Sequence, residues 1–346
     1  MKINTAIIGF GMSARVFHSP LIEACEEFHI KTVYSSNEDK VLEKIPYTKA
    51  TNSIEEIFED SEIDLIVICG PNHTHYDLTK QALIKGINVV VEKPFVASVN
   101  EGKELIEIAK KQNKILSVFH NRRWDCDFLA VKDIIKNNQL GDIQLFETFY
   151  DRWRPITRDG KWREKPGVAT GILYDLGSHL IDQVIELFGV PQAVFGDIVD
   201  QKENYGIDDY FHLILKYDKT RVIIRGNSFS LSPQRFHILG NKANYLKTGI
   251  DPQAEKLDQG IDPLSSNFGK EDHIQSGKLI TPDGERLINS PHGNYMSYYK
   301  QLAEAIKENN PQLNPVKPQD ALQVIKIIEL AIKSNNQKKW INYEDD

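Results

Sequence analysis

The sequence predicts a doubly wound parallel α/β sheet over residues 1–120. An α+β domain with a large, mostly antiparallel open sheet is predicted over residues 121–346. Three observations support this prediction. Apolar runs alternate with helical patterns through the first 120 residues, and longer stretches of alternating apolar and polar residues follow Gly141. The length of 346 residues also suits two domains better than one.

Five apolar runs in the first domain have the composition of buried parallel strands. They are Ile3–Ile8, Ile30–Tyr34, Leu65–Cys69, Asn88–Val91 and Ile115–His120. The helical patterns between them are Ala14–Ala24, Ser53–Phe58 with a Ser-x-x-Glu capping signal, His75–Lys85 and Asn100–Lys111. Because strands and helices alternate with short links, we expect a parallel sheet with helices on both faces.

The second domain has a different texture. Its expected strands are Gln144–Arg152, Ala193–Gln201, Asp209–Tyr217, Arg221–Phe229 and Arg235–Leu246, with a hairpin turn at residues 218–220 and a helix at Tyr174–Leu187. Residues 250–292 are rich in Asp, Pro, Gly, Ser and Asn, which indicates a long excursion. Two helices, Asn294–Asn309 and Pro318–Ser334, close the chain and can pack back on the first domain.

Composition and charge exclude several classes of protein. A chain that is 40% hydrophobic and 26% charged is globular rather than disordered or fibrous. The net charge of −7 argues against a protein that coats nucleic acid or an anionic membrane. Three scattered cysteines without a C-x-x-C pair favour a reducing compartment over disulfides or zinc. Without a signal peptide or an apolar run of ~18 residues, we expect a cytoplasmic protein.

A glycine-rich turn follows the first predicted strand. Gly9, Phe10, Gly11, Met12, Ser13 and Ala14 form a G-x-G-x-x-A run that opens a helical pattern. The first glycine permits a tight turn, the second lets the backbone approach a pyrophosphate, and Ala14 keeps the helix close to the strand. The position predicts a Rossmann domain that binds a dinucleotide; the alternative is a purely structural turn.

The end of the second strand bears on which dinucleotide is bound. NAD enzymes place an acidic residue there to hold the adenosine ribose, whereas this chain has Ser35, Ser36 and Asn37, with no carboxylate before Glu38. Small polar side chains leave room for a 2′-phosphate and do not repel it. This favours NADP over NAD; the alternative is a polar loop that has no part in the choice of dinucleotide.

Two further segments carry reactive side chains, and the first of them follows a central strand, at the edge where ligands of open α/β sheets bind. Glu92, Lys93 and Pro94 follow the strand Asn88–Val91. Much later, Asp175 and His179 are four residues apart, which puts both on one helix face. A metal site at His73 and His75 is disfavoured because no Cys or carboxylate has matching spacing, so we expect no metal.

Together these motifs resemble the glucose-fructose oxidoreductase/inositol dehydrogenase/rhizopine catabolism (Gfo/Idh/MocA) family over essentially the whole chain. The resemblance rests on the early G-x-G-x-x-A, the Glu-Lys-Pro tripeptide and the Asp-x-Gly-x-His-x-x-Asp stretch that begins at Asp175. The Phe-His-Ser-Pro that ends at Pro20 and the paired serines are similar to the branch with NADP-dependent scyllo-inositol dehydrogenases. That branch usually carries Arg where this chain has Asn37, which weakens the NADP assignment.

The resemblance implies hydride transfer between the nicotinamide and a secondary alcohol of a cyclitol, sugar or polyol. His179 would be the general base, Lys93 would donate a hydrogen bond to the reacting oxygen, and Asp175 would orient substrate or histidine. Cofactor contacts are implied for Pro71, Asn72, His75, Glu92 and Lys93. The alternatives are a reductase or dehydrogenase of another substrate class, such as a trans-dihydrodiol, and a non-catalytic NADP-sensing regulator on the same scaffold.

Arginine and tryptophan concentrate between residues 122 and 163, where six of the eleven arginines fall. Aromatic faces suit sugar C–H groups, and Arg suits hydroxyl clusters, carboxylates or phosphate. The family resemblance implies that this segment borders the substrate pocket, which makes Arg152, Trp153 and Trp162 candidate substrate contacts. The equal alternative is a salt-bridged domain junction. We also expect a homodimer or homotetramer through the C-terminal sheet, whose alternating residues over 209–229 would leave one broad apolar face.

Overall fold

The computed structural model describes residues 2–156, 165–202, 206–232 and 234–344. The chain forms two compact units. The first contains Met1–Trp124, Pro252–Phe268 and Asn294–Leu322, and the second contains Asp125–Asp251, Gly269–Gly293 and Gln323–Asp346. The predicted boundary at residue 120 lies close to the end of the longest segment of the first unit. Two later segments return to the first unit, because α8 (Gln253–Asp258) packs on the helical turn Ala14–His18 and α9 (Met296–Lys307) packs on α1 (Ser19–Glu23).

The sheet of the first unit is parallel throughout, as predicted. Its order is β3-β2-β1-β4-β5-β6, and consecutive neighbours pair in parallel. The strands are β1 (Ile3–Ile8), β2 (Phe28–Tyr34), β3 (Lys49–Thr51), β4 (Leu65–Ile68), β5 (Asn88–Val91) and β6 (Leu116–Val118). All five predicted strands are present. The edge strand β3 was not predicted, since three residues are too few to show a period.

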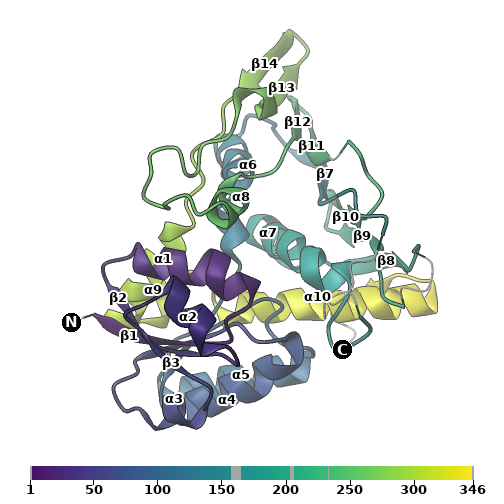
Figure 1. Cartoon of the computed structure of the whole chain (residues 1–346). Helices are drawn as coiled ribbons and strands as arrows, with labels where there is room; N and C mark the ends of the chain where they lie inside the picture. The colour runs from purple at the N-terminus through teal and green to yellow at the C-terminus, as the bar shows by residue number, and fades with distance from the viewer. Residues whose placement is uncertain (1, 157–164, 203–205, 233, 345–346) are drawn as a thin grey trace. The chain divides into compact units, whose positions relative to one another are not determined.

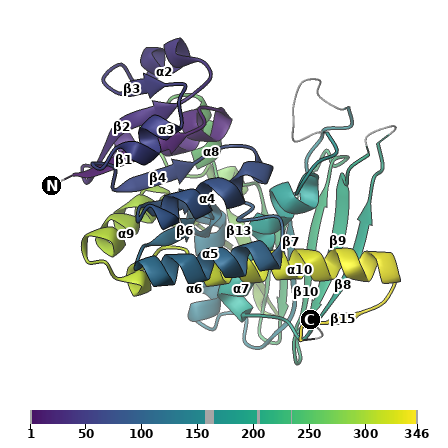
Figure 2. The same cartoon turned by 90° about the horizontal axis from the view of Figure 1, so that it is seen from below.

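The helices of the first unit cover both faces of this sheet, so the doubly wound prediction is confirmed. In Figure 1, α1 lies on one side of the sheet, and α3, α4 and α5 lie on the other. Figure 2 shows α4 and α5 side by side. The remaining elements are η1 (Ala14–His18), α2 (Glu38–Lys44), α3 (Glu55–Glu59), η2 (Asn72–Thr74), α4 (His75–Ile84), α5 (Val99–Gln112), η3 (Asn121–Trp124) and η7 (Pro311–Leu313).

The second unit contains a nine-stranded sheet of order β14-β13-β12-β11-β7-β10-β9-β8-β15. Every neighbouring pair is antiparallel except β10 and β7. The strands are β7 (Ile143–Phe149), β8 (Ala193–Val199), β9 (Tyr210–Lys216), β10 (Arg221–Asn227), β11 (Gln234–Gly240), β12 (Asn244–Thr248), β13 (Gly277–Thr281), β14 (Gly284–Ile288) and β15 (Ile341–Asn342). The predicted large, mostly antiparallel sheet is confirmed.

Two predictions about these strands are wrong in detail. The stretch Arg235–Leu246 is not one strand, because the chain turns at residues 241–243 and returns antiparallel as β12. The segment 250–292 is more ordered than an excursion, since it contains α8, η6 (His273–Gln275) and the β13–β14 hairpin. The predicted β9–β10 hairpin is confirmed, with Lys216 opposite Arg221.

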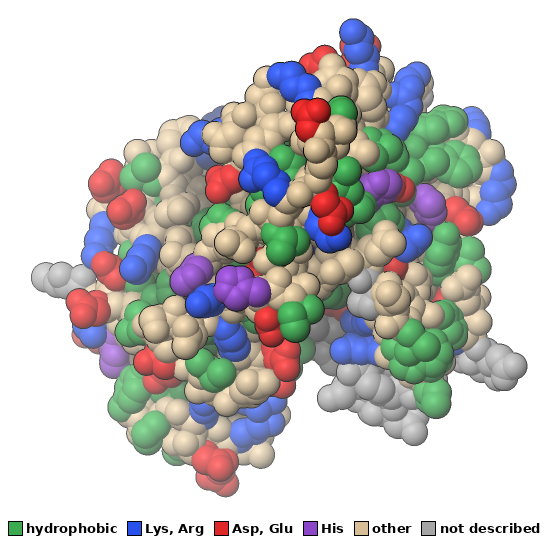
Figure 3. All heavy atoms as spheres, turned by 90° about the horizontal axis from the view of Figure 1, so that it is seen from above, with side chains coloured by type: hydrophobic (Ala, Val, Ile, Leu, Met, Phe, Trp, Pro, Cys, Tyr) green, Lys and Arg blue, Asp and Glu red, His purple; other side chains and the backbone are tan. Residues whose placement is uncertain are grey.

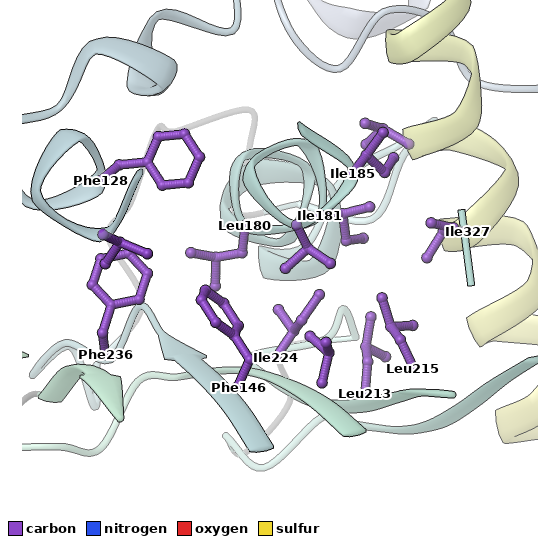
Figure 4. Packing of buried hydrophobic residues seen from close by; sticks show 14 of the residues in the cluster. Phe128, Phe146, Leu180, Ile181, Ile185, Leu213, Leu215, Ile224, Phe236 and Ile327 are labelled. Carbon is purple, nitrogen blue, oxygen red and sulfur yellow. The ribbon is translucent and has the colours of Figure 1, made fainter. Parts of the chain in front are cut away.

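The core of the second unit lies between one face of the sheet and three helices (Figure 4). These are α6 (Cys126–Lys136), α7 (Ser178–Phe188) and the later part of α10 (Pro318–Gln337), which begins in the first unit. Phe146 and Ile224 of the sheet pack with Leu180 of α7, and all three are fully buried. Packing of this area removes apolar surface from water, which is worth about 25 cal/mol per Å².

Surface chemistry agrees with the composition. On the face drawn in Figure 3, Lys and Arg side chains lie among Asp and Glu side chains rather than in one continuous basic stripe. Within the residues that the structure describes, no helix combines the length and apolar character needed to cross a membrane.

Candidate active site

The glycine turn lies between β1 and η1, as the motif predicts. Gly9 has φ +94°, and a Cβ there would come within 3.1 Å of the Cys69 main chain, so only glycine fits without strain. At Gly11 the opposite holds, because a Cβ would meet no heavy atom within 4 Å. Phe10, Ser13 and Ala14 are buried beneath the turn, whereas Met12 is exposed. The turn thus offers backbone and open space, which fits a pyrophosphate.

The end of β2 carries the residues expected to select the dinucleotide. Ser35 Oγ accepts a hydrogen bond from the Asn37 main chain (3.1 Å), and Asn37 Oδ1 accepts one from the Lys40 main chain (3.0 Å). Asn37 is thereby the N-cap of α2. Ser36 and Asn37 are exposed, whereas Ser35 is buried.

The end of β4 carries Pro71 and Asn72, which begin η2, and His75, which begins α4. Asn72 is buried just beyond the carboxyl end of β4. The ring of His75 is also buried, and its nitrogens lie 2.8 Å from the Pro94 carbonyl oxygen and 3.1 Å from that of Gly70. His75 therefore ties together the chain segments that follow β4 and β5. No group of three or more His, Cys, Asp or Glu residues in the described part of the chain is arranged to hold a metal ion.

Glu92 and Lys93 follow β5 directly, and both side chains are almost fully buried. Glu92 Oε2 accepts a hydrogen bond from the Lys93 main-chain N–H (3.0 Å), and the Lys93–Pro94 peptide is cis. The other oxygen of the same carboxylate, Oε1, lies 3.0 Å from His18 Nε2. His18 was not among the residues predicted for the site, although its motif contributed to the family resemblance.

Asp175 and His179 belong to the second unit, on one continuous helical run. Asp175 lies in η5 (Leu173–Gly177), a π-helical turn, and His179 lies one turn later in α7. Both residues thus lie on one helical run, with His179 buried and Asp175 partly exposed. Asp208 Oδ2 accepts from the Leu173 main-chain N–H (2.7 Å) and so holds the start of this run. Burial raises the pKa of Asp208 to about 6.

Of the predicted substrate contacts, Arg152 lies beside this helix. Its guanidinium nitrogen is 3.9 Å from Asp175 Oδ2. Residues that follow β7 still bond to the end of β10, since the Arg152 main-chain N–H donates to the Asn227 carbonyl (3.0 Å). Trp153 is 53% exposed and forms an isolated bridge with Phe229. Trp162 lies outside the described residues.

The rest of the arginine and tryptophan cluster divides between the two units. Arg123 is in the first unit and pairs with Asp320 (3.4 Å), while Trp124 packs edge-on against Tyr298. Both contacts lie within the first unit, whereas the Arg152–Asp175 pair lies within the second. The cluster therefore does not form one feature.

Comparison with known proteins identifies the chain. Residues 3–120 match the family model described as the NAD-binding Rossmann fold of the oxidoreductase family, and residues 132–343 match the model of its C-terminal alpha/beta domain. The chain belongs to the Gfo/Idh/MocA oxidoreductase family. Its first unit is thus an NAD(P)-binding Rossmann domain, and the sequence-based resemblance is confirmed.

Individual members of the Gfo/Idh/MocA family align over nearly the full chain. The scyllo-inositol 2-dehydrogenase (NADP(+)) IolW of Bacillus subtilis is 39% identical over 99% of this chain and 96% of its own length. The oxidoreductase YdgJ of Escherichia coli is 39% identical over 96% of both chains. The solved structure of the Bacillus subtilis oxidoreductase yvaA has a TM-score of 0.95 at 38% identity and covers 99% of this chain and 98% of its own.

Proposed function

We propose that the protein is an NADP-preferring dehydrogenase that oxidises a secondary alcohol of a cyclitol, sugar or polyol. The proposal rests above all on Lys93, Asp175 and His179, whose local sequence motifs resemble those of the oxidoreductase family to which the chain belongs. The similarity to a scyllo-inositol 2-dehydrogenase along the whole chain supports the substrate class.

In the proposed reaction, a nicotinamide cofactor bound at the glycine turn would supply the acceptor for the hydride that leaves the carbinol carbon. His179 takes the hydroxyl proton, since an imidazole with a reference pKa of about 6.5 can exchange protons near neutral pH. The C–H and O–H bonds break and a C=O bond forms, so the products are a ketone, a reduced cofactor and a protonated histidine. Lys93 donates a hydrogen bond to the oxygen on which negative charge develops.

Asp175 and Arg152 would bind the substrate and would take no part in the proton transfer. A carboxylate accepts hydrogen bonds from hydroxyl groups, and a guanidinium donates them to oxygen. Their side chains are 3.9 Å apart and each is about a quarter exposed, so both keep polar atoms available to a polyhydroxylated ligand. This arrangement suits vicinal hydroxyl groups.

The NADP preference rests on the end of β2. Neither Ser35, Ser36 nor Asn37 carries a charge that would repel a 2′-phosphate. The IolW enzyme, similar to this chain throughout, is an NADP(+) enzyme by name.

The test is a spectrophotometric screen at 340 nm, with NADP and NAD offered against inositols, hexoses and diols. We expect turnover with NADP and at least one cyclitol or sugar. Lys93→Ala and His179→Ala should each lower kcat by at least ~100-fold with little change in cofactor affinity. Near-normal turnover in either variant removes that residue from the mechanism. Tight NADPH binding without turnover of any substrate would instead indicate the regulator.

We also propose that the sheet of the second unit mediates a homodimer or homotetramer. Alternate residues of β9 and β10, among them Phe211, Leu213 and Val222, are buried in the core, and their neighbours form the second face of the sheet. That face is more mixed than expected, because Ile214 and Ile223 lie on it with His212 and Arg225. Its residues are half-buried in a single chain, which leaves area for a second copy to cover.

A further inference from the structure

A buried chain of hydrogen bonds connects three distant parts of the first unit. The Tyr299 hydroxyl lies 2.5 Å from His18 Nδ1, and His18 Nε2 lies 3.0 Å from Glu92 Oε1. Glu92 Oε2 then accepts from the Lys93 main-chain N–H at 3.0 Å. His18 ends η1, Glu92 follows β5 and Tyr299 lies on α9.

The two contacts of the His18 ring are compatible with one direction of hydrogen bonding. A carboxylate at Glu92 accepts hydrogen bonds, which matches a His18 ring that carries its proton on Nε2 and donates it. Burial holds the pKa of Tyr299 well above its ordinary value, so the phenol keeps its proton and can donate to Nδ1. The His18 ring is fully buried and packs on Phe119 at a centroid distance of 4.1 Å. Water therefore does not compete for its nitrogens.

We infer that His18 is a positioning residue for Lys93 and acts through Glu92. One Glu92 oxygen is held by the imidazole, and the other holds the main chain of Lys93, so the ring orients the backbone from which the lysine side chain projects. The inference rests on the proposed function, in which the Lys93 ammonium contacts the reacting oxygen.

The position of His18 gives this contact a second consequence. His18 ends the same helical turn that Ala14 begins, directly after the glycine turn proposed to hold the pyrophosphate. The His18–Glu92 bond therefore links the cofactor-binding turn to the segment that carries Lys93. A side chain that joins these two segments fixes the position of one relative to the other within the unit.

The experiment compares four variants of the full chain. His18→Leu removes both ring contacts, His18→Gln restores a donor that can reach Glu92, and Tyr299→Phe removes only the hydroxyl. Tyr298→Phe is the matched control, because Tyr298 is an equally buried neighbour on α9 whose hydroxyl donates to Ser117 (2.8 Å) instead. All four substitutions are made in the protein with Lys93 intact. His18→Leu is also combined with Lys93→Ala in a double variant.

Two readouts separate positioning from general stability. Hydrogen exchange of the cofactor-free protein should rise selectively in the peptide that contains Glu92 and Lys93 for His18→Leu, but not for Tyr298→Phe. Loss of a hydrogen bond to a charged group should lower kcat by about tenfold or more in His18→Leu, with most of it recovered in His18→Gln. In the Lys93→Ala background, His18→Leu should change the residual rate less than about twofold, because coupled residues are not additive.

Unchanged exchange at Glu92 and Lys93 in His18→Leu overturns the inference, as does an equal loss of kcat with and without Lys93. If His18→Leu does not fold, Tyr299→Phe against Tyr298→Phe decides by the same exchange measurement. Normal kcat in Lys93→Ala contradicts the proposed function instead, and the exchange result still decides whether His18 holds this segment.

Discussion

Asp208 is a carboxylic acid that the fold keeps largely buried beside the helix carrying Asp175 and His179. Its pKa is raised to about 6 from the ordinary 3.8, with burial as the main cause. The native state therefore binds this proton more tightly than the unfolded state does. Between pH ~4 and ~6 the contribution of Asp208 to stability falls as pH rises, and above that range the ionised form remains a cost of about 1–3 kcal/mol.

Asp208→Asn should remove this cost, since an amide oxygen can still accept from the Leu173 main-chain N–H. We expect the variant to match the wild type near pH 4 and to exceed its stability above pH 7, as measured by denaturant unfolding across that range. A variant that is less stable than the wild type at pH 8 would show that the carboxylate itself is required.

Asn37 offers a test of cofactor choice that leaves the fold intact. Asn37→Asp keeps the side-chain oxygen that caps α2, and Asp is an equally good N-cap. The added negative charge should repel a 2′-phosphate and favour a ribose diol. We expect the ratio of the NADPH and NADH dissociation constants to rise about tenfold in fluorescence titrations, roughly 1.4 kcal/mol. An unchanged ratio would place the 2′-phosphate away from Asn37.

At the scale of elements, α5 begins with a complete capping box. Ser98 Oγ accepts from the Glu101 main chain, and the Glu101 carboxylate accepts from that of Ser98. Ser98→Ala should destabilise the first unit by about 1 kcal/mol and lower its melting temperature by roughly 2–4 °C. Ser61→Ala, at an exposed turn, is the control and should have no effect. An equal effect of both variants in calorimetry would contradict the cap's role.

The elements show where sequence patterns are informative. Buried parallel strands such as Ile3–Ile8 and Asn88–Val91 are continuous apolar runs, and their predicted bounds match the structure. The π-helical turns at Ala14–His18 and Leu173–Gly177 have no such signature, because their patterns suit an ordinary helix equally well. The β11–β12 turn was missed since Asn241 and Lys242 interrupt the alternation only briefly.

The candidate site shows the complementary limit. Lys93, Asp175 and His179 are recognisable because each lies in a short local motif. His18 is not, because its partner Tyr299 is 281 residues away in the sequence and no local period links them. Arg152 was predicted only as part of a cluster of arginines and tryptophans, and its contact with Asp175 is visible only in the tertiary structure.

For the whole molecule, the proposed assembly can be tested at the centre of the second sheet. Ile214 and Ile223 are direct cross-strand partners on its second face. Ile214→Asp should shift the protein to a smaller mass in light scattering coupled to gel filtration, because a buried unpaired charge opposes association. Ile274→Asp, at a residue already 89% exposed, should leave the mass unchanged. A wild-type protein with the mass of one chain would contradict the proposal.

The place of β7 in the larger sheet has a consequence for how the chain reaches its fold. β7 lies between β10 and β11, and both of these partners begin about 75 or more residues later in the sequence. During synthesis, the central strand therefore leaves the ribosome with two unpaired edges and stays so until both partners have emerged. Contacts of such long range slow folding, and open edges invite pairing with other chains. A chain truncated before Arg221 retains these edges permanently and should aggregate.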